Sequence, residues 1–495
     1  MKTRLPSSLA ALALFAQAPC ASAENGDVEE LKAMVREMQK TIAEQNARIA
    51  TLENQKAAPS KKTTARKSPK PAEKEPDMAA AGIDVPVGAP PVVAEPKEIS
   101  AIRDADTFAD LQQAAPRVNN APLDPKLKGF IPIPGTDTLF KIGGSARIDS
   151  ILDFEDNGNP NQFVPSSIPV PGQSGWDGGE RTAFQAKGTR LSLELRRPVA
   201  NDDTLRIYSE YDFFDDSASS AMKFRTRHFY GQAWNFLIGQ TFSAFMDIDA
   251  FPDVVDYQGP NGIVNRRQPQ IRYTLPVYDD VGEVQLFASV EQPESKIDTV
   301  LPDFAPGSST VSRLPDSVVG ARWEGDTGHI QSAAIFRELS YESDHGPDDD
   351  VLGWGVNFSG SLNIGEKDKL SAQATYGEGI SRYINDLSGE NLDAAFDGGD
   401  FEAIPVFAAM AGYTHHWNGR WRSTISGGYV HTDAPDSLGP FAIQDTLYSS
   451  VNLMWHPTAS FRMGLEYLYG HKETLDGSEG DANRLNFVVR YDLVR

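Results

Sequence analysis

Cysteine is nearly absent from this chain of 495 residues, since the single cysteine is Cys20, close to the first residue. A chain with no other cysteine forms no internal disulfide and offers no further thiolate as a nucleophile or metal ligand. Long apolar runs are also missing after residue 23, so no segment there supplies the roughly 20 apolar residues of a membrane-spanning helix. These absences exclude disulfide-stapled folds and helical membrane proteins.

Positive charge is also scarce, because 46 Lys and Arg face 69 Asp and Glu and give a formal net charge of −23. Nucleic acids bind clustered excess positive charge, so they are excluded as partners. His415 and His416 are adjacent and would point to opposite faces of a strand, which prevents joint chelation. No GxSxG or glycine-rich phosphate motif occurs either. We therefore expect no enzyme activity, no cofactor and no metal site.

The first 23 residues have the composition of an export signal. They contain a basic head with Lys2 and Arg4, an apolar segment over 9–18 and a small-residue cleavage site, Ala-Ser-Ala, at 21–23. Acylation of Cys20, as in a lipoprotein, competes with simple removal of the segment. Pro19 before the cysteine and the Ala-Ser-Ala beyond it favour removal, so residues 1–23 are predicted to be a cleaved signal peptide.

Residues 24–56 show a heptad pattern, which predicts a short coiled coil and hence an oligomer. The packing rules lean towards two strands, although Gln45 in the seam complicates the count. An amphipathic helix lying on its own domain is the alternative. The predicted seam residues are Val28, Leu31, Val35, Met38, Ile42, Ile49 and Leu52.

A segment rich in Lys, Pro and Ala follows, and residues 57–128 are predicted to be a linker and plug-in segment that is mostly irregular. Its basic residues suggest contact with an anionic polymer such as peptidoglycan, and a solvated spacer is the simpler alternative. These residues are Lys61, Lys62, Arg66, Lys67 and Lys70.

From Leu139 onward, apolar and polar residues alternate in segments that recur to the end of the chain, which is typical of β-strands with two different faces. Short connections such as 417–420 alternate with long ones such as 378–405, as in membrane barrels with one plain and one elaborate rim. The roughly sixteen strands are predicted to begin near Leu139, Thr182, Thr204, Lys223, Trp234, Val264, Val281, Asp316, Gly328, Val351, Asp368, Ile404, Arg420, Thr446, Ser460 and Asn483.

The faces of these strands indicate which solvent each side meets. In the last strand Leu485, Phe487 and Val489 alternate with Arg484 and Arg490. Side chains cannot fill a barrel of sixteen strands, so the charged face is predicted to line an aqueous lumen and the apolar face to meet lipid. Aromatic bands at the two membrane interfaces are predicted from Tyr208, Tyr211, Trp323, Trp417, Trp421, Trp455 and Tyr467.

The long apolar connection 242–262 is predicted to fold into the lumen and narrow it. Its carboxylates would either face the channel or hold the loop in shape, and they are Asp247, Asp249, Asp253 and Asp256. Arginines on the polar strand faces would favour anions in such a passage. Lateral pairing with Glu194, Glu210, Asp212 or Glu283 is the structural alternative. The arginines predicted to set selectivity are Arg190, Arg225, Arg227, Arg266, Arg272 and Arg337.

Several stretches resemble the DcaP-like family of outer-membrane porins over residues 129–495. They include GFIPIPGTDTLFKIGG (129–144), FLIGQTFSAFMD (236–247), GPNGIVNRRQPQIRYT (259–274), SVEQPES (289–295), RLPDSVVGARWEGDTGHIQ (313–331) and YGEGISRYINDLSG (376–389). The resemblance implies a trimeric porin of sixteen strands, general or dicarboxylate-preferring, with a periplasmic coiled-coil extension. It favours three copies over the two suggested by the heptads.

The sequence thus predicts an all-β protein, a transmembrane antiparallel β-barrel over 129–495 in a Gram-negative outer membrane. Its expected function is passive diffusion of small anionic, dicarboxylate-like solutes through an arginine-lined lumen. The alternative is a structural anchor, in which the barrel tethers the membrane to the cell wall through the coiled coil and linker.

Overall fold

A computed structural model describes residues 129–201, 203–214, 221–278, 282–305, 307–346 and 348–493. The predicted signal peptide, coiled coil and linker over residues 1–128 lie outside these ranges, as do the seam residues and the basic linker residues named above.

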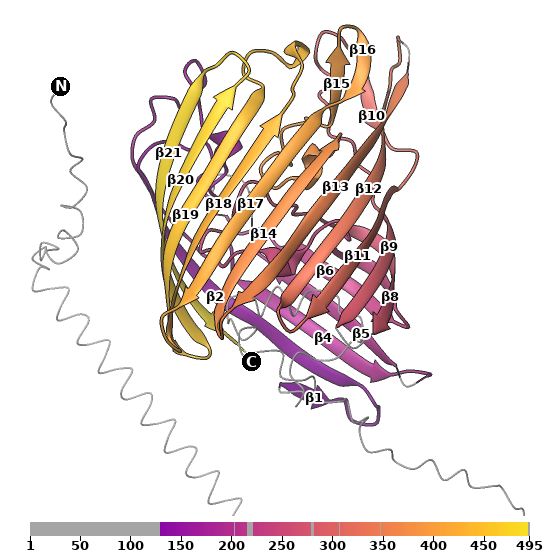
Figure 1. The fold of residues 1–495 in the computed structure, drawn as a ribbon, viewed down its shortest axis with the longest axis vertical. Helices are drawn as coiled ribbons and strands as arrows, with labels where there is room; N and C mark the ends of the chain where they lie inside the picture. Colours follow the sequence, from indigo (N-terminus) through magenta and orange to yellow (C-terminus); the bar gives the residue numbers. More distant parts are fainter. Residues whose placement is uncertain are drawn as a thin grey trace, which may run out of the picture. The chain divides into compact units, whose positions relative to one another are not determined.

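The described residues fold into a sheet of 19 strands that closes on itself (Figure 1). Three of the 19 are short segments, β1 (Phe130–Pro132), β3 (Arg181–Gln185) and β10 (Ser309–Val311), which leaves the sixteen strands of the barrel wall. These are β2 (Leu139–Asp153), β4 (Arg190–Pro198), β5 (Thr204–Asp212), β6 (Arg225–Ala233), β7 (Phe236–Phe242), β8 (Arg267–Tyr278), β9 (Glu283–Glu291), β11 (Asp316–Gly325), β12 (Gly328–Glu342), β13 (Asp349–Ile364), β14 (Asp368–Glu378), β17 (Pro405–His416), β18 (Trp421–Thr432), β19 (Ile443–Thr458), β20 (Phe461–Thr474) and β21 (Glu479–Asp492).

Closure comes from the pairing of the first and last wall strands. Ser145 to Asp153 of β2 pair antiparallel with Asp492 to Arg484 of β21. Every other neighbouring pair in the wall is antiparallel as well. A closed antiparallel barrel leaves no strand edge unpaired, which is what a hydrocarbon surrounding requires of backbone groups. The predicted all-β barrel of sixteen strands is confirmed.

Most strands begin within three residues of the predicted positions, but the strand expected at Thr182 is split in two. β3 pairs with the end of β2 and β4 pairs with its start. Between them the hydroxyl of Thr189 accepts a hydrogen bond from the amide of Arg147, at 3.1 Å. A side chain thus replaces a ladder partner at the break, which sequence alternation does not reveal.

The two rims differ as predicted, with tight turns at one and long loops at the other. The turn between β6 and β7 is one of the tight turns. Trp234 and Asn235 occupy it with φ of 50° and 66°, the left-handed pair that a two-residue hairpin needs.

The short helical turns belong to the loops, and are η3 (Pro165–Ser167), η4 (Ile248–Ala250), η5 (Ser381–Tyr383) and η6 (Asp436–Leu438). The hairpin β15 (Ala394–Asp397) and β16 (Asp400–Ala403) also lies in a loop.

The outer wall exposes apolar side chains such as Ile148, Phe358 and Ile425, which are 55%, 57% and 60% exposed. Polar partners on the same strands point inward. The prediction of Tyr208 in an interfacial band is wrong, because it shares the inward face of β5 with Glu210 and is 1% exposed. No helix in the described ranges is long and apolar enough to cross a membrane.

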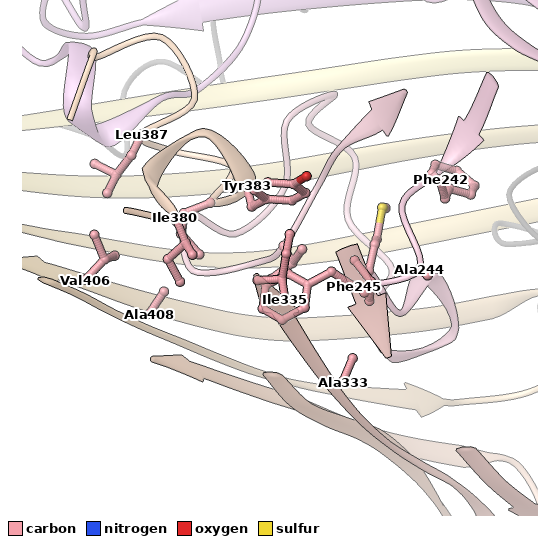
Figure 2. Packing of buried hydrophobic residues seen from close by; sticks show 14 of the residues in the cluster. Phe242, Ala244, Phe245, Ala333, Ile335, Ile380, Tyr383, Leu387, Val406 and Ala408 are labelled. Atoms are coloured by element: carbon pink, nitrogen blue, oxygen red, sulfur yellow. The ribbon is translucent and has the colours of Figure 1, made fainter. Parts of the chain in front are cut away.

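Two loops fold into the barrel and pack on each other. The loop between β7 and β8 (243–266) and the loop between β14 and β17 (379–404) share three backbone hydrogen bonds, Asn265 to Tyr383, Asn385 to Ile263 and Asp386 to Asn261. Phe245 and Tyr383 meet edge to face with ring centroids 5.9 Å apart. Figure 2 shows side chains of both loops gathered against inward residues of the wall. The buried cluster includes Phe242, Ala244, Ile380, Leu387, Ala333, Ile335, Val406 and Ala408.

We call the loop over residues 243–266 the inward loop. At Gly262 it lies directly against the backbone of β17. A Cβ at Gly262 would lie 2.2 Å from the carbonyl oxygen of Ala409 in β17. Beside it, Asn261 donates to Thr446 of β19, to the carbonyl at 3.1 Å and to the hydroxyl at 2.9 Å. The inward loop therefore needs glycine at 262 to reach its seat.

Replacement of Gly262 by Ala is expected to destabilise the folded barrel by about 1–3 kcal/mol, because the added methyl group must displace backbone in a packed site. The measurement is the temperature at which the compact band of the unheated protein is lost on a denaturing gel. Gly419→Ala is the matched control, because a Cβ at this turn residue has no neighbour within 4 Å. Equal melting of the two variants would contradict the close approach.

Candidate functional site

The inward loop is attached to the wall by its carboxylates. Asp247 accepts hydrogen bonds from Arg322 of β11 at 3.0 Å and Ser359 of β13 at 2.8 Å, and it contacts the ring of His329 at 2.8 Å. Asp249 accepts from the other terminal nitrogen of Arg322, at 2.8 Å. Burial opposes ionisation, but the contact with His329 and the charge of Arg322 hold the pKa of Asp247 well below its usual range. These two carboxylates hold the loop and do not line the cavity described below.

Further along, the inward loop crosses to the strands near barrel closure. Asp253 forms an ion pair with Arg422 of β18, and Asp256 lies 3.5 Å from Arg484 of β21. The carboxylate of Glu466 in β20 accepts from the backbone amides of Val255 and Asp256, at 3.0 and 2.7 Å. The carbonyl of Val255 also accepts from Arg147 of β2, at 2.6 Å. Since the loop contacts strands from β11 round to β2, it crosses the inside of the barrel.

Tyr257 lies at the point where the inward loop reaches β5 and β6. Its hydroxyl accepts a hydrogen bond from Arg227 at 2.6 Å and donates one to Asp212. Its ring faces the guanidinium groups of Arg147 and Arg190, 5.7 and 6.0 Å from the ring centroid. Cation–π contacts of this kind hold arginines in place without neutralising them. Tyr257 therefore organises the charged wall opposite the loop.

Between the inward loop and the wall lies a cavity of about 400 Å³. Eight arginines line it, against two carboxylates, Asp253 and Asp256. Seven of them lie on β20, β21, β2, β4, β6 and β8, and the eighth directly precedes β8. With β5 and β7 between them, these strands are neighbours on both sides of the β2–β21 pairing that closes the barrel. We call this set the arginine arc, and it consists of Arg147, Arg190, Arg225, Arg227, Arg266, Arg267, Arg462 and Arg490.

Four of the six predicted selectivity arginines belong to the arc. Arg225 makes two bonds to the carboxylate of Asp212 and keeps 34% of its side chain exposed. Arg266 pairs with Glu294 at 2.6 Å and is 24% exposed. Arg227 pairs with Asp212 and Glu210, while Arg190 lies 3.6 Å from Glu210. These four arginines thus both line the cavity and pair laterally with carboxylates.

The other two predicted arginines lie elsewhere. Arg272 donates to the carbonyl of Phe242 at 2.5 Å and to the side chain of Gln270, outside the cavity lining. Arg337 has no exposed side-chain surface and pairs with Asp316 and Asp393, at 3.2 and 3.1 Å. The charge of Arg337 is thus paired within a buried network under the loops. Neither Arg272 nor Arg337 lines the cavity, so neither belongs to the arginine arc.

In one part of the wall the arginines only pair with a carboxylate of the same or a neighbouring strand, as the structural alternative predicts. Arg196 and Arg206 both donate to the carboxylate of Glu194, at 2.7 and 2.9 Å, and all three are buried. These residues lie on β4 and β5 towards the short-turn rim and do not line the cavity. Here the arginines stabilise the wall.

Sequence reasoning missed Arg147, Arg267, Arg462 and Arg490 as members of the arc. Alternation could have found Arg147, which shares a face with Asp149 and Asp153, and the last strand already showed Arg490 on its polar face. Arg267 had no such signal. Gln268 and Gln270 face inward, so alternation assigns Arg267 to the outer face, yet it lines the cavity as the first residue of β8.

Comparisons with known proteins agree with this architecture. A family model described as "DcaP outer membrane protein" matches residues 127–493. The crystal structure of the outer membrane channel DcaP of Acinetobacter baumannii is 25% identical, with 74% of this chain and 100% of that chain covered and a TM-score of 0.63. No curated protein matches the chain.

Two other solved structures are more distant. An anion-selective porin from Comamonas acidovorans is 11% identical over 72% of this chain and 100% of its own, with a TM-score of 0.47. OmpT of Vibrio cholerae is 13% identical over 73% and 99%, with a TM-score of 0.44. Because the family model spans nearly all of the barrel, the chain belongs to the DcaP outer membrane protein family and is a porin, a β-barrel channel of the bacterial outer membrane.

Proposed function

We propose that this porin conducts small anionic solutes, with dicarboxylate-like molecules preferred, and that the arginine arc and the inward loop select them. The observation that carries the proposal is the lining of the cavity, with eight arginines against two carboxylates. Both carboxylates are matched by arginines behind them, Asp253 by Arg422 and Asp256 by Arg484. The surface facing a solute therefore has an excess of positive charge.

The excess persists when the carboxylates that pair with the arc are counted. Among the ion pairs within the described ranges these carboxylates number five, Asp149, Glu210, Asp212, Glu294 and Asp492, against eight arginines. Among the residues that the structure describes, none forms an ion pair or hydrogen bond with the side chain of Arg267. Its guanidinium is thus available to a passing anion.

The mechanism is passive diffusion with electrostatic selection. A solute in the narrow passage loses part of its hydration, and fixed charges of opposite sign offset that loss. Because the arc extends over several neighbouring strands, a solute with two carboxylates can contact arginines at both of its ends. Cations meet the same field as a barrier.

Replacement of Arg225, Arg266 and Arg267 together by Gln is expected to lower the anion-over-cation permeability ratio about tenfold. A unit charge about 8 Å from an ion in water contributes roughly 0.5 kcal/mol, which salt screening reduces to roughly 0.2 kcal/mol. Because the charge acts with opposite sign on an anion and a cation, the permeability ratio changes about twofold per arginine. The measurement is the reversal potential across a salt gradient in a planar bilayer. Arg420→Gln, in an exposed turn, makes the same type of charge change outside the cavity and is the control. An unchanged ratio in the triple variant would overturn the assignment of the arc.

Tyr257 offers a separate test of how the arc is organised. Tyr257→Phe keeps the ring beside Arg147 and Arg190 and loses only the hydroxyl contacts. Tyr257→Ala removes the ring, so the arginines lose a fixed support and the passage widens. We expect single-channel conductance to rise by half or more in the Ala variant and to stay near the original value in the Phe variant. Indistinguishable conductance in the two variants would argue against this role.

We also propose that three copies assemble through the coiled coil over residues 24–56, as the family resemblance implies. Deletion of residues 24–96 is expected to leave single-channel conductance and ion selectivity per barrel unchanged, because the cavity is built within residues 129–493. Cross-linking before and after deletion measures the copy number. Under the anchor alternative, the same deletion abolishes sedimentation with purified peptidoglycan, and a full-length chain that never sediments rules that alternative out.

A further inference from the structure

The outer face of β18–β21 carries a row of titratable residues at the loop rim. Strand register places His431 opposite Asp445, Asp445 opposite Glu473, and Glu473 opposite Glu479. Two residues closer to the membrane, His471 lies opposite Asp481. Four neighbouring strands thus bring imidazole and carboxylate groups together on one surface.

This surface lies at the edge of the apolar belt. Along β20, Leu465 and Tyr467 are 43% and 44% exposed on the outer face, and Tyr469, His471 and Glu473 follow at alternate positions. The order from aliphatic to aromatic to charged side chains matches the change from hydrocarbon to interface to water. The row therefore meets solvent and lipid headgroups and is accessible from outside.

His471 is oriented by a neighbouring carboxylate. Asp481 accepts a hydrogen bond from the hydroxyl of Tyr469 at 2.6 Å and lies 2.9 Å from Nδ1 of His471. A proton on Nδ1 donated to Asp481 leaves the lone pair of Nε2 free. A carboxylate that fixes the tautomer in this way is the usual support of a metal-binding histidine.

The same tyrosine–aspartate–histidine arrangement occurs twice more, which gives internal references. Asp368 contacts the hydroxyl of Tyr413 and Nδ1 of His415, at 2.7 and 2.8 Å. Asp445 contacts Tyr429 and His431 likewise, and the second ring nitrogen of His431 lies 3.2 Å from Asp433. The arrangement by itself therefore explains only an oriented histidine at a membrane edge.

Two glutamates distinguish His471 from the other two histidines. Glu473 and Glu479 each offer an oxygen, and these oxygens and a ring nitrogen of His471 all lie within 4.8 Å of one another. Within the described ranges, no other group of three or more His, Cys, Asp or Glu residues meets this condition. Ligands about 2.1 Å from a shared ion lie roughly 3.4 Å apart, so small side-chain rotations suffice to close on one.

The charges also favour a cation. Glu473 lies opposite Glu479 on one side and Asp445 on the other, and like charges directly opposite in a sheet repel. No Lys or Arg among the described residues forms an ion pair with Glu473 or Glu479. A bound divalent ion would offset this repulsion, which nothing else in the described structure does.

We propose that His471, Glu473 and Glu479 form an external binding site for a divalent cation of the zinc type, oriented by Asp481. Imidazole with two carboxylates suits Zn²⁺, whereas Ca²⁺ and Mg²⁺ prefer oxygen ligands alone. The site lies on the outer wall and is independent of the permeation cavity, so it extends the protein beyond its role as a channel.

The test uses the full-length, tag-free protein in detergent, treated with a chelator and titrated calorimetrically with ZnCl₂. One site per chain is expected. His471→Ala and the double variant Glu473→Gln, Glu479→Gln should lose it, and Asp481→Asn should weaken it about 10- to 100-fold. His415→Ala, which alters the same triad where no glutamates are present, should bind zinc as the original protein does.

Three outcomes would overturn the proposal. They are zinc affinity unchanged in His471→Ala, zinc affinity lost equally in His415→Ala, and CaCl₂ or MgCl₂ binding more tightly than ZnCl₂. Single-channel conductance serves as an integrity check, because each variant lies outside the cavity and should retain the conductance of the original protein.

Discussion

A bilayer offers no hydrogen-bond partner to a peptide group, and this constraint governs the rest of the structure. The pairing of β2 with β21 answers it by giving every wall strand two neighbours. Once the wall is closed, the alternation of side chains fixes where polarity goes. Within the apolar belt, aliphatic residues face lipid and the Arg, Glu and Asp residues described above face the inside, whereas outward carboxylates such as Glu473 lie at the rim.

Charge placed inside a barrel must be matched, and the inward loop is part of the matching. Its carboxylates meet Arg322, Arg422 and Arg484 from three separated strands. Breaking one partner of a buried pair costs several kcal/mol, so these pairs fix the path of the loop even where they add little net stability. The loop in turn leaves the arginine arc facing open space. Arginines of the wall therefore differ chiefly in whether they face the cavity, since Arg227 of the arc pairs with two carboxylates whereas Arg196 and Arg206, outside the cavity lining, share one.

The barrel was predictable because its two signals, alternation and connection length, are local. Leu139, Thr204, Asp316, Gly328 and Asp368 begin strands as predicted. β19 and β21 begin earlier than expected, at Ile443 and Glu479, because pairing continues past the apolar belt into polar residues. Hydrophobic periodicity cannot mark a strand end that lies in water.

The site was only partly predictable, because long-range pairing decides it. Nothing near Arg337 in the sequence indicates that Asp393, 56 residues away, will bury its charge. Arg267 joins the arc against the alternation of its own strand, and Tyr257 gains its role from Asp212 and Arg227 on other strands. Local pattern gives the face of a residue, and only the folded loop gives its partners.

The buried apolar cluster and the arginine arc lie on different parts of the wall. Apolar loop residues such as Phe245 and Ile380 pack in one buried cluster with inward residues of β12 and β17, whereas the arc lies on strands that flank the closure of the barrel. The apolar packing of the loops and the proposed selection of solutes thus involve largely separate sets of side chains. Related barrels can therefore differ in their arc residues, and so in the solutes they prefer, while they keep the same buried apolar cluster.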